Sequence, residues 1–528
     1  MAELMTIKEA SKWASEYLKK TVSTSNISYL VQYGQIKKIG ENGSTFVSKD
    51  DLIKYYKSYN GKREINYKSK FGNDLNWTLS FSHLREIDTT KHVHRLHPYK
   101  GKFIPQLVEY FLDANTDQFK KNVYFKKGNI VLDPFCGSGT TLVQANELGM
   151  HAIGVDISAF NTFISNIKIN KHNLTAIYDA CNIITNSLHK FLANKRTLQF
   201  EEKLLEELAK FNNKFFPSPN FKFQLRNNEI DEKQFSEIKE KEFLSIYYHL
   251  VNAYQIKLFN KKTDTFLNKW YLKPVRDEID FVYNEILKVE NEDTQKILKL
   301  ILSRTIRSCR ATTHSDLATL LDPVNETYYC YKHKKICKPL FSILNWWDRY
   351  SKDTIKRLEY FDKKCRTDET HQICITGDSS SLNIHKELYN KQRNLYNLIK
   401  DKKISGIFSS PPYVGLIDYH EQHAYAYDLL GFNRQDELEI GRLSNGQSKS
   451  ARESYVDGIS GVLINCKQFL KNDFNIFLVA NDKYNLYPTI AEKSGLQIVN
   501  TFKRPVLNRT EKDKTAYSEF IFHMKEKL

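Results

Sequence analysis

The segment GNIVLDPFCGSGTTLVQANELGMHAIGVDIS, Gly128–Ser158, constrains the fold of this chain more than any other part of the sequence. The run Asn129–Leu132 predicts a short buried strand, a glycine-rich turn follows, and Thr141–Leu148 has the pattern of a helix. A second apolar run, Ala152–Val155, ends in Asp156. In a strand, turn, helix, strand unit, ligands bind at the carboxyl ends of the strands. We therefore predict an α/β fold with a Rossmann-like sheet and a ligand site at this turn.

Several residues of the segment suit a binding loop. Gly137 and Gly139 let the backbone approach a ligand that a Cβ would obstruct. Asp156 stands where an acidic residue commonly binds ribose hydroxyls. A glycine loop alone could also bind a dinucleotide, but the complete string DPFCGSGTT, Asp133–Thr141, closely resembles the first motif of S-adenosylmethionine-dependent amino-methyltransferases. The alternative is a nucleotide-binding loop of another α/β enzyme.

The resemblance implies a site for S-adenosylmethionine. It places Asp133 on the methionine amino group, Thr140 and Thr141 beside the carboxylate at a helix N-terminus, and Asp156 on the ribose. Upstream, HRLHPYKGKFIPQL resembles an additional cofactor motif that closes over the methionine end, and GDS at 377–379 resembles the family's third motif, near the adenine. The expected cofactor contacts are His97, Tyr99, Phe103, Asp133, Pro134, Phe135, Cys136, Gly137, Gly139, Thr140, Thr141, Asp156, Ile157 and Asp378.

The segment ISGIFSSPPYVGLIDY supplies the expected chemistry. Ile404–Ser409 predicts a strand, and a turn with two prolines follows it. Prolines have no N–H, so carbonyls at this turn, together with the Ser410 hydroxyl, can accept hydrogen bonds from the exocyclic amino group of a base. This would favour a tetrahedral nitrogen whose lone pair points at the methyl group, and Tyr413 would stack on the extruded base. The expected catalytic residues are Ser410, Pro411, Pro412 and Tyr413.

The proline-turn motif also indicates which base is the target. Serine in its first position is associated in the family with N4 of cytosine, whereas Asp or Asn more often marks N6 of adenine, so we favour cytosine. Transfer to C5 of cytosine is not expected, because no Pro-Cys pair occurs in the chain.

Residues 1–60 read as a separate module. Two helices, a hairpin around Asn42-Gly43 and a third helix ending near Tyr59 are predicted, and this order resembles excisionase and MerR-like winged helix-turn-helix modules. The resemblance implies that Ser25, Asn26, Ser28, Tyr29 and Gln32 face a DNA groove and that Lys37 and Lys38 face phosphates. A protein-binding or dimerising winged helix is the alternative.

The remaining chain is divided by its patterns. Residues 61–74 form a Lys-rich linker, 76–171 the first part of the methyltransferase domain, 172–370 a largely helical insert expected to recognise the target, and 371–528 the second part. Within the insert, Arg304, Arg307 and Arg310 could form a phosphate-contacting helix face or a solvated one. Cys330, His333 and Cys337, with Cys309 nearby, have a spacing that zinc could use, but regular knuckles have tighter pairs, so no metal is assigned.

Composition agrees with a nucleic-acid partner. The formal charge is +17, from 79 Lys and Arg against 62 Asp and Glu, and such a surface attracts a polyanion. The sequence lacks a bilayer-length apolar run and a secretory signal, so no membrane is expected and the cytoplasm is the expected compartment. We predict a site-specific DNA methyltransferase of a restriction-modification or related defence system, with duplex DNA as substrate and a cognate restriction endonuclease as a candidate partner. The alternatives are a tRNA guanine-N2 methyltransferase and a non-catalytic winged-helix regulator.

Overall fold

The computed structural model describes residues 3–18, 22–32, 36–40, 45–59, 63–81, 84–193, 195–314, 320–507 and 516–527. The chain divides into two compact units, each built from three stretches of sequence. The first unit comprises Met1–Asn66, Ser187–Asp280 and Cys309–Ile343. The second, here called the sheet unit, comprises Tyr67–Asn186, Phe281–Ser308 and Leu344–Leu528.

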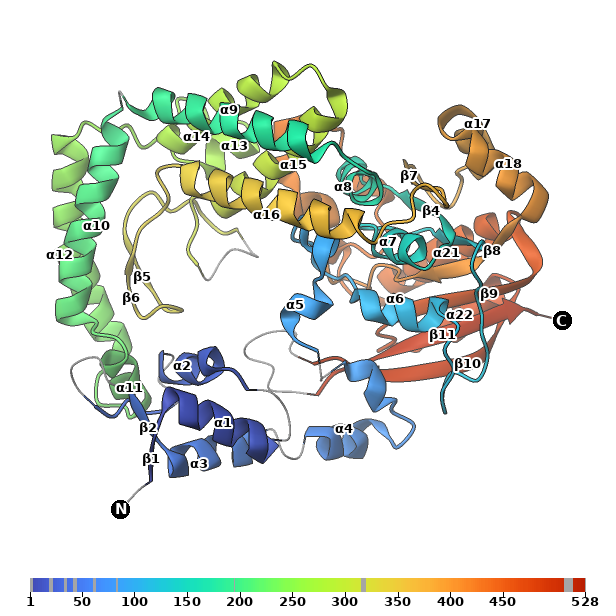
Figure 1. Cartoon of the computed structure of the whole chain (residues 1–528), viewed down its shortest axis with the longest axis horizontal. Coiled ribbons are helices and arrows are strands. Elements are labelled where there is room, and N and C mark those ends of the chain that lie inside the picture. The colour runs from blue at the N-terminus through green and yellow to red at the C-terminus, as the bar shows by residue number, and fades with distance from the viewer. Residues whose placement is uncertain are drawn as a thin grey trace. The chain divides into compact units, whose positions relative to one another are not determined.

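The sheet unit contains a seven-stranded sheet (Figure 1). Five parallel strands lie in the order β9-β8-β3-β4-β7, and β11 and then β10 extend the β9 edge by antiparallel pairing. From the central β3 the chain proceeds outward to β4 and β7 on one side and later to β8 and β9 on the other, which is the doubly wound arrangement. The strands are β3 (Ile130–Asp133), β4 (His151–Asp156), β7 (Gln372–Thr376), β8 (Ile404–Ser409), β9 (Leu470–Ala480), β10 (Leu496–Pro505) and β11 (Ser518–Glu526).

Helices cover both faces of the sheet, so its central strands are apolar on both sides. On one face, Ile130 and Leu132 of β3 belong to a core that four helices complete. On the other face, the Phe111 ring packs on Phe408 and Phe477 with centroids 5.6 and 5.0 Å apart. The first layer consists of α17 (Ile384–Lys391), α18 (Arg393–Lys402), α21 (Lys449–Lys467) and α22 (Tyr487–Lys493), and the second of α6 (Pro105–Leu112), α7 (Thr140–Glu147) and α8 (Ala159–Ile169).

The insert is helical, as predicted, but the two units share it. α15 and α16 belong to the sheet unit, where Arg357 of α16 donates hydrogen bonds to the carbonyls of Thr90 and His92 at 3.2 and 3.0 Å. The predicted insert 172–370 is therefore not one compact body. Its elements are α9 (Leu174–Ala193), α10 (Arg196–Phe215), α11 (Asn220–Arg226), α12 (Glu232–Ala253), α13 (Phe266–Trp270), α14 (Lys273–Leu287), α15 (Glu292–Ser308), β5 (Tyr328–Cys330), β6 (Lys335–Cys337) and α16 (Leu344–Asp362).

The N-terminal module contains the three predicted helices, with a different pairing of strands. Thr6 and Glu9 form the capping box, since the Glu9 N–H donates to Thr6 Oγ1 at 3.2 Å and the Thr6 N–H donates to Glu9 Oε2 at 2.9 Å. The hairpin partner expected at 36–39 is reduced to one bridge between Ile39 and Phe46, and β2 pairs instead with β1. The Asn42-Gly43 turn lies outside the described residues. The elements are β1 (Leu4–Thr6), α1 (Ile7–Leu18), α2 (Thr24–Gln32), β2 (Phe46–Ser48) and α3 (Lys49–Tyr59).

The stretch predicted as a linker is partly helical. Its residues form α4 (Arg63–Phe71), and the Tyr67 ring contacts Trp77 with centroids 5.8 Å apart, so the stretch is packed and not free. In the described parts of the chain, every helix falls short of the length or apolar character that crossing a bilayer requires. The shorter elements are η1 (Trp77–Ser80), α5 (Glu86–Thr89), η2 (His92–Arg95), α19 (Tyr419–Gln422), α20 (Ala424–Leu430), η3 (Asp436–Leu438) and η4 (Leu443–Asn445).

Candidate active site

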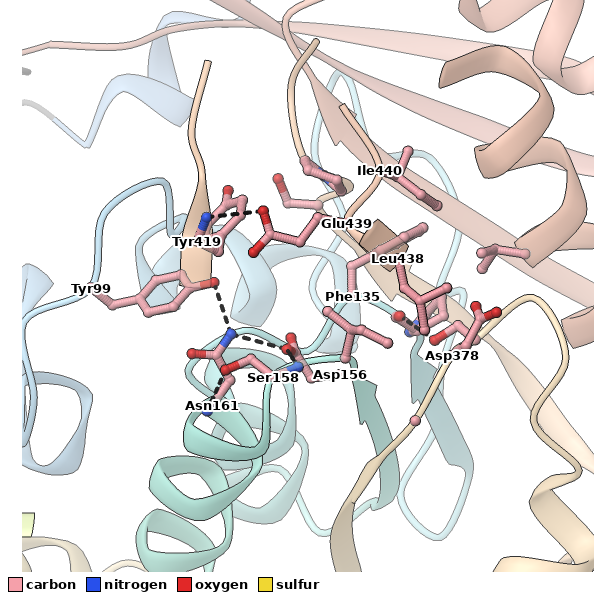
Figure 2. Close-up of a pocket in the computed structure, with 17 residues that line it drawn as sticks. Tyr99, Phe135, Asp156, Ser158, Asn161, Asp378, Tyr419, Leu438, Glu439 and Ile440 are labelled. Atoms are coloured by element: carbon pink, nitrogen blue, oxygen red, sulfur yellow. Dashed lines mark hydrogen bonds between the residues drawn. The ribbon is translucent and has the colours of Figure 1, made fainter. Parts of the chain in front are cut away.

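A cavity opens at the carboxyl edge of the parallel strands (Figure 2). Phe135 follows β3, Asp156 ends β4, Asp378 follows β7 and Ser410 follows β8, so four strand ends contribute to one wall. The glycine-rich turn and the proline turn, distant in sequence, meet here because β3 and β8 are neighbours in the sheet. The lining comprises Tyr99, Pro134, Phe135, Asp156, Ile157, Ser158, Asn161, Gly377, Asp378, Ser379, Ser410, Pro412, Tyr419, Leu438, Glu439, Ile440 and Val462.

The glycine-rich turn requires glycine at two positions. Gly139 is the N-cap of α7 with φ +75°, and a Cβ there would lie 2.8 Å from Ser165 Oγ. Gly137 has φ +52°, and a Cβ there would lie 3.0 Å from the Tyr99 hydroxyl oxygen. The left-handed region costs other residues about 1–2 kcal/mol, so both positions favour glycine by conformation as well as by space.

Asp156 presents a buried carboxylate to the cavity. Its Oδ2 accepts from the Gly137 N–H at 2.7 Å, and its Oδ1 accepts from the Ser158 N–H at 2.9 Å and from Asn161 Nδ2 at 3.0 Å. Burial raises the pKa of Asp156 to about 6, although these hydrogen bonds favour the charged form. The buried Asn161 Oδ1 has no hydrogen-bond partner among the described residues. The wall thus offers a carboxylate beside an unpaired acceptor, which suits hydroxyl or amino donors of a ligand.

Asp133 joins the two turns. Its Oδ1 accepts from the Ser409 hydroxyl at 2.5 Å and from the Phe135 N–H at 3.2 Å. The Thr141 hydroxyl donates to the Phe408 carbonyl at 3.3 Å, so α7 is also tied to β8. Burial raises the pKa of Asp133 to about 6. These contacts fix the start of the glycine-rich turn against the end of the strand that carries the proline turn.

The proline turn presents hydrogen-bond acceptors to the cavity. The Ser410 hydroxyl donates to the carbonyl of Val479 at 3.1 Å, so its proton is engaged and its oxygen can accept. Pro411 and Pro412 have no N–H, so this part of the turn offers only carbonyls. Ser410 and Pro412 line the cavity, and Pro411 is buried.

Tyr413, the last residue of the proline-turn motif, faces a cavity other than the one that Ser410 and Pro412 line. Its hydroxyl donates to Glu519 Oε1 at 2.9 Å, and Glu519 Oε2 lies 3.5 Å from Arg504 Nε. Burial raises the pKa of Tyr413 well above its usual range. The residue lines a second cavity of about 670 Å³, whose walls also include Asn481, Tyr484 and Tyr517. The four-residue motif therefore contributes to both cavities, Ser410 and Pro412 to the first and Tyr413 to the second.

Some expected cofactor residues support the first cavity without lining it. His97 is buried, with Nδ1 3.0 Å from the Pro98 carbonyl and Nε2 3.2 Å from the Tyr425 hydroxyl, and burial holds the pKa of His97 well below its usual value. The Phe103 ring packs edge-on against Phe408 at 5.5 Å. The other expected residues outside the lining are Asp133, Cys136, Gly137, Gly139, Thr140 and Thr141.

Sequence reasoning missed part of the wall. Ser158 and Asn161 stand two and five positions after Asp156, and the Asn161 N–H donates to Ser158 Oγ at 3.2 Å, a helix N-cap that the sequence could have indicated. Glu439 comes from a segment without a local signal. Its Oε1 accepts from the His420 N–H at 2.7 Å, and it also pairs with the imidazole of His420. Figure 2 shows Glu439 between Leu438 and Ile440, on the wall that faces Phe135 and Asp156.

The basic residues expected to touch DNA have mixed surroundings. Arg304 is buried, with Nη2 2.6 Å from Asp353 Oδ2 and its guanidinium over the Tyr350 ring, and Arg310 is also buried. This differs from the expected exposed face, because α15 is buried around most of its circumference; Arg307 is half-buried. In the N-terminal module, Asn26, Ser28 and Lys37 are exposed and Lys38 is half-buried, whereas the side chains of Ser25, Tyr29 and Gln32 lie outside the described residues.

A doubly wound sheet with a cavity at the carboxyl ends of its parallel strands defines a Rossmann-like α/β fold. The family model described as DNA methylase matches residues 7–166. The type II methyltransferase M.MjaII of Methanocaldococcus jannaschii is 46% identical over 528 residues, covering 99% of this chain and 97% of that protein. The type II methyltransferase M.MvaI of Kocuria varians is 36% identical over 104 residues, which cover 20% of this chain and 21% of that protein.

One solved structure, the rRNA methyltransferase aviRa from Streptomyces viridochromogenes, aligns over 84% of this chain and 94% of that one with 8% identity and a TM-score of 0.27, too low to define the fold. The identity to M.MjaII extends over nearly all of both chains. This chain belongs to the type II DNA methyltransferase family.

Proposed function

We propose that this methyltransferase moves the methyl group of S-adenosylmethionine onto the exocyclic amino nitrogen of a base flipped out of duplex DNA, with N4 of cytosine favoured over N6 of adenine. The observation that carries the proposal is the first cavity, in which the ends of β3, β4 and β7 meet the serine and proline acceptors that follow β8. A cofactor site and a row of acceptors in one cavity suit methyl transfer to a donor group.

The first cavity fits the proposed cofactor. Asp156 would accept from the ribose hydroxyls, and the unpaired Asn161 Oδ1 can accept from a further donor. Phe135, Leu438 and Ile440 give apolar surface for the adenine. When bound, the cofactor supplies an electrophilic methyl group. The chain's own contribution is to hold that group facing the proline turn.

The proline turn would prepare the nucleophile. The lone pair of an exocyclic amine is delocalised into the base, so the amine attacks poorly while planar. Acceptors at Ser410 and Pro411 would take hydrogen bonds from its two N–H groups and favour a tetrahedral nitrogen, because Ser410 already donates its proton to Val479. The methylated nitrogen then carries a positive charge and releases a proton to water.

The second cavity is the proposed site of the flipped base. Tyr413, Tyr484 and Tyr517 line it, and aromatic rings stack on bases of any sequence. Tyr413 is held by Glu519, so its ring is fixed before a base arrives. Ser410 lies three residues before Tyr413 in the same turn, so this turn would connect a base held here with the acceptor in the first cavity.

The biological setting is proposed from the family and from charge. A net charge of +17 suits contact with DNA phosphates, and the exposed Asn26, Ser28 and Lys37 of the N-terminal module are candidates for that contact. The relatives are named type II methyltransferases, which favours a role as the modification enzyme of a restriction system, with a cognate endonuclease as partner.

The test is transfer of labelled methyl groups from S-adenosylmethionine to unmethylated duplex DNA by the purified chain. The double variant Ser410→Ala with Tyr413→Ala should lose transfer and keep measurable cofactor binding by calorimetry. Ser405→Ala, near the start of the strand β8 that precedes the proline turn, is the control and should retain transfer. Label in tRNA and none in DNA would favour a tRNA methyltransferase, and cofactor binding without any transfer would favour a regulator.

A further inference from the structure

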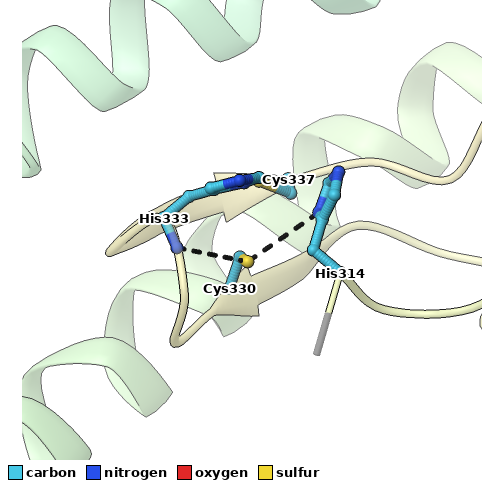
Figure 3. Close-up of side chains that lie close together, drawn as sticks. All are labelled: His314, Cys330, His333 and Cys337. Carbon is cyan, nitrogen blue, oxygen red and sulfur yellow. Dashed lines mark hydrogen bonds between the residues drawn. The ribbon is translucent and has the colours of Figure 1, made fainter. Parts of the chain in front are cut away.

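Four metal-ligating side chains converge in the first unit, outside the site described above (Figure 3). They are His314, Cys330, His333 and Cys337, and one ligand atom from each lies within 4.8 Å of all the others. Cys330 Sγ lies 3.8 Å from His314 Nδ1, and Cys337 Sγ lies 3.6 Å from His333 Nδ1. Two thiols and two imidazoles form the donor set of many structural zinc sites.

The spacing of these atoms matches a tetrahedral zinc ion. With Zn–S of about 2.3 Å and Zn–N of about 2.0–2.1 Å, neighbouring ligand atoms in a tetrahedron are roughly 3.3–3.8 Å apart. The two sulfur–nitrogen distances, 3.8 and 3.6 Å, lie in the upper part of this range. The longest separation, at most 4.8 Å, needs a movement of only about 1 Å, which side-chain rotation can supply.

The backbone of the hairpin is arranged around the same atoms. β5 and β6 pair Tyr328 with Cys337 and Cys330 with Lys335, so both cysteines lie on one face of the hairpin, Cys330 beside the turn and Cys337 two positions farther along the ladder. In the turn, the His333 N–H donates to Cys330 Sγ at 3.4 Å, and the Lys334 N–H donates to the Cys330 carbonyl at 2.6 Å. A backbone donor on a sulfur stabilises the negative charge of a metal-bound thiolate.

His314 reaches the hairpin from a separate segment. Its backbone N–H donates to the Tyr328 hydroxyl at 3.1 Å, and the same hydroxyl lies 2.8 Å from Nδ1 of its ring, a contact that an ion bound at Nδ1 would replace. The hairpin itself has a small core of Tyr328, Cys330 and Cys337 with Val324 packed on it. A two-stranded hairpin is marginally stable alone, so a tetrahedral ion that also holds His314 would supply the cross-link that its apolar contacts do not.

Other side chains near these positions are less suited to bind zinc. Cys309, which the sequence placed near these ligands, is not a member of the cluster. His92, His94 and Glu147 also lie close together, but they lack sulfur, and Lys91 Nζ lies 2.7 Å from Glu147 Oε2 and already neutralises it. All eight cysteines of the chain are free thiols, so Cys330 and Cys337 are available as ligands.

We propose that His314, Cys330, His333 and Cys337 bind one structural Zn²⁺ ion, which fastens the β5–β6 hairpin to the segment ending at His314. Four protein ligands leave no open position on a tetrahedral ion, so the role is structural and not catalytic. The proposal is independent of the proposed methyl transfer, because no ligand belongs to either cavity.

The test measures zinc in the full-length chain, purified under reducing conditions without chelator, by plasma mass spectrometry. One zinc per chain is expected in the natural protein and in Cys365→Ser, a thiol outside the cluster. Cys330→Ser and Cys337→Ser should each lose the ion. Should those variants fail to fold, the natural protein stripped by a chelator and titrated with Co²⁺ should show the absorption bands of a tetrahedral thiolate site, which two equivalents of a mercurial thiol reagent abolish.

Folded full-length protein that holds no zinc after reconstitution and gives no such cobalt bands would overturn the proposal. One zinc per chain retained in both Cys330→Ser and Cys337→Ser would overturn it as well, because the ion would then be bound elsewhere. A Cys330–Cys337 disulfide found by mass spectrometry in reduced protein would have the same effect.

Discussion

Replacing Ser410 by alanine removes one acceptor from the proline turn and little else. The Ser410 hydroxyl donates to the Val479 carbonyl at 3.1 Å, which leaves its oxygen as an acceptor at the cavity wall. The reacting amine gains positive charge as it is methylated, so a hydrogen bond to Ser410 strengthens in the transition state. Loss of that bond should therefore lower the rate of transfer more than the binding of cofactor.

The size of the effect follows from the charge on the donor. Hydrogen bonds to charged groups contribute about 1.5–3 kcal/mol, and about 1.4 kcal/mol corresponds to tenfold in rate, so Ser410→Ala should slow transfer by roughly 10- to 150-fold. The Val479 carbonyl loses one donor, which costs about 1 kcal/mol of folding free energy. The carbonyl of Pro411 remains, so transfer is slowed and not abolished.

The assay is single-turnover transfer of labelled methyl groups to duplex DNA with enzyme in excess, beside calorimetric binding of S-adenosylmethionine. Ser405→Ala removes the hydroxyl of a buried serine on β8, the strand that precedes the proline turn, so it is the control and should keep the natural rate. An unchanged rate in Ser410→Ala, or equal losses in Ser410→Ala and Ser405→Ala, would refute the role assigned to the serine oxygen.

Three further results are expected. Gly139→Ala places a Cβ 2.8 Å from Ser165 Oγ at φ +75°, and should lower the free energy of unfolding by about 1–3 kcal/mol, measured by urea denaturation; unchanged stability would contradict the strain. Because burial raises the pKa of Asp156 to about 6, the affinity for the cofactor should fall as the pH is lowered through 6, where the protonated carboxyl no longer accepts hydrogen bonds from both ribose hydroxyls. Asp156→Asn should reduce this pH dependence of cofactor affinity, measured by calorimetry. An equal pH dependence in both proteins would argue against the role of Asp156. Arg304→Ala leaves the half-buried Asp353 with one partner fewer, so it should destabilise the fold by about 1–3 kcal/mol while leaving the salt dependence of DNA binding unchanged; a shallower salt slope would restore the phosphate-contacting role.

The sequence predicted the parts of the fold that short-range patterns determine. Ile404–Ser409 forms the strand expected before the proline turn, and Asp156 ends a strand as expected. These predictions succeed because a buried parallel strand is a continuous apolar run and the polar residue that follows it stands at the sheet edge. The sequence also predicted that the glycine-rich turn and the proline turn lie side by side, because the carboxyl ends of parallel strands share an edge of the sheet.

Other features depend on contacts between distant segments and had no local pattern. Glu439 reaches the cavity through hydrogen bonds with His420, and His314 reaches the hairpin cysteines from a separate segment. The three-residue spacing of Arg304 and Arg307 indicates a shared helix face but not whether that face is exposed, and Asp353 of another helix covers it. The division of the insert between two units could not be predicted from the sequence for the same reason.

The methyl group of the cofactor and the amino group of the base are proposed to meet between the glycine-rich turn and the proline turn. The most direct test is nucleoside mass spectrometry of unmethylated duplex DNA after incubation with the purified chain and isotope-labelled S-adenosylmethionine. We predict labelled N4-methylcytosine, strongly reduced by Ser410→Ala. Labelled N6-methyladenine would contradict the choice of base, and DNA without label from folded, cofactor-binding protein, whatever duplex sequence is offered, would contradict the claim itself.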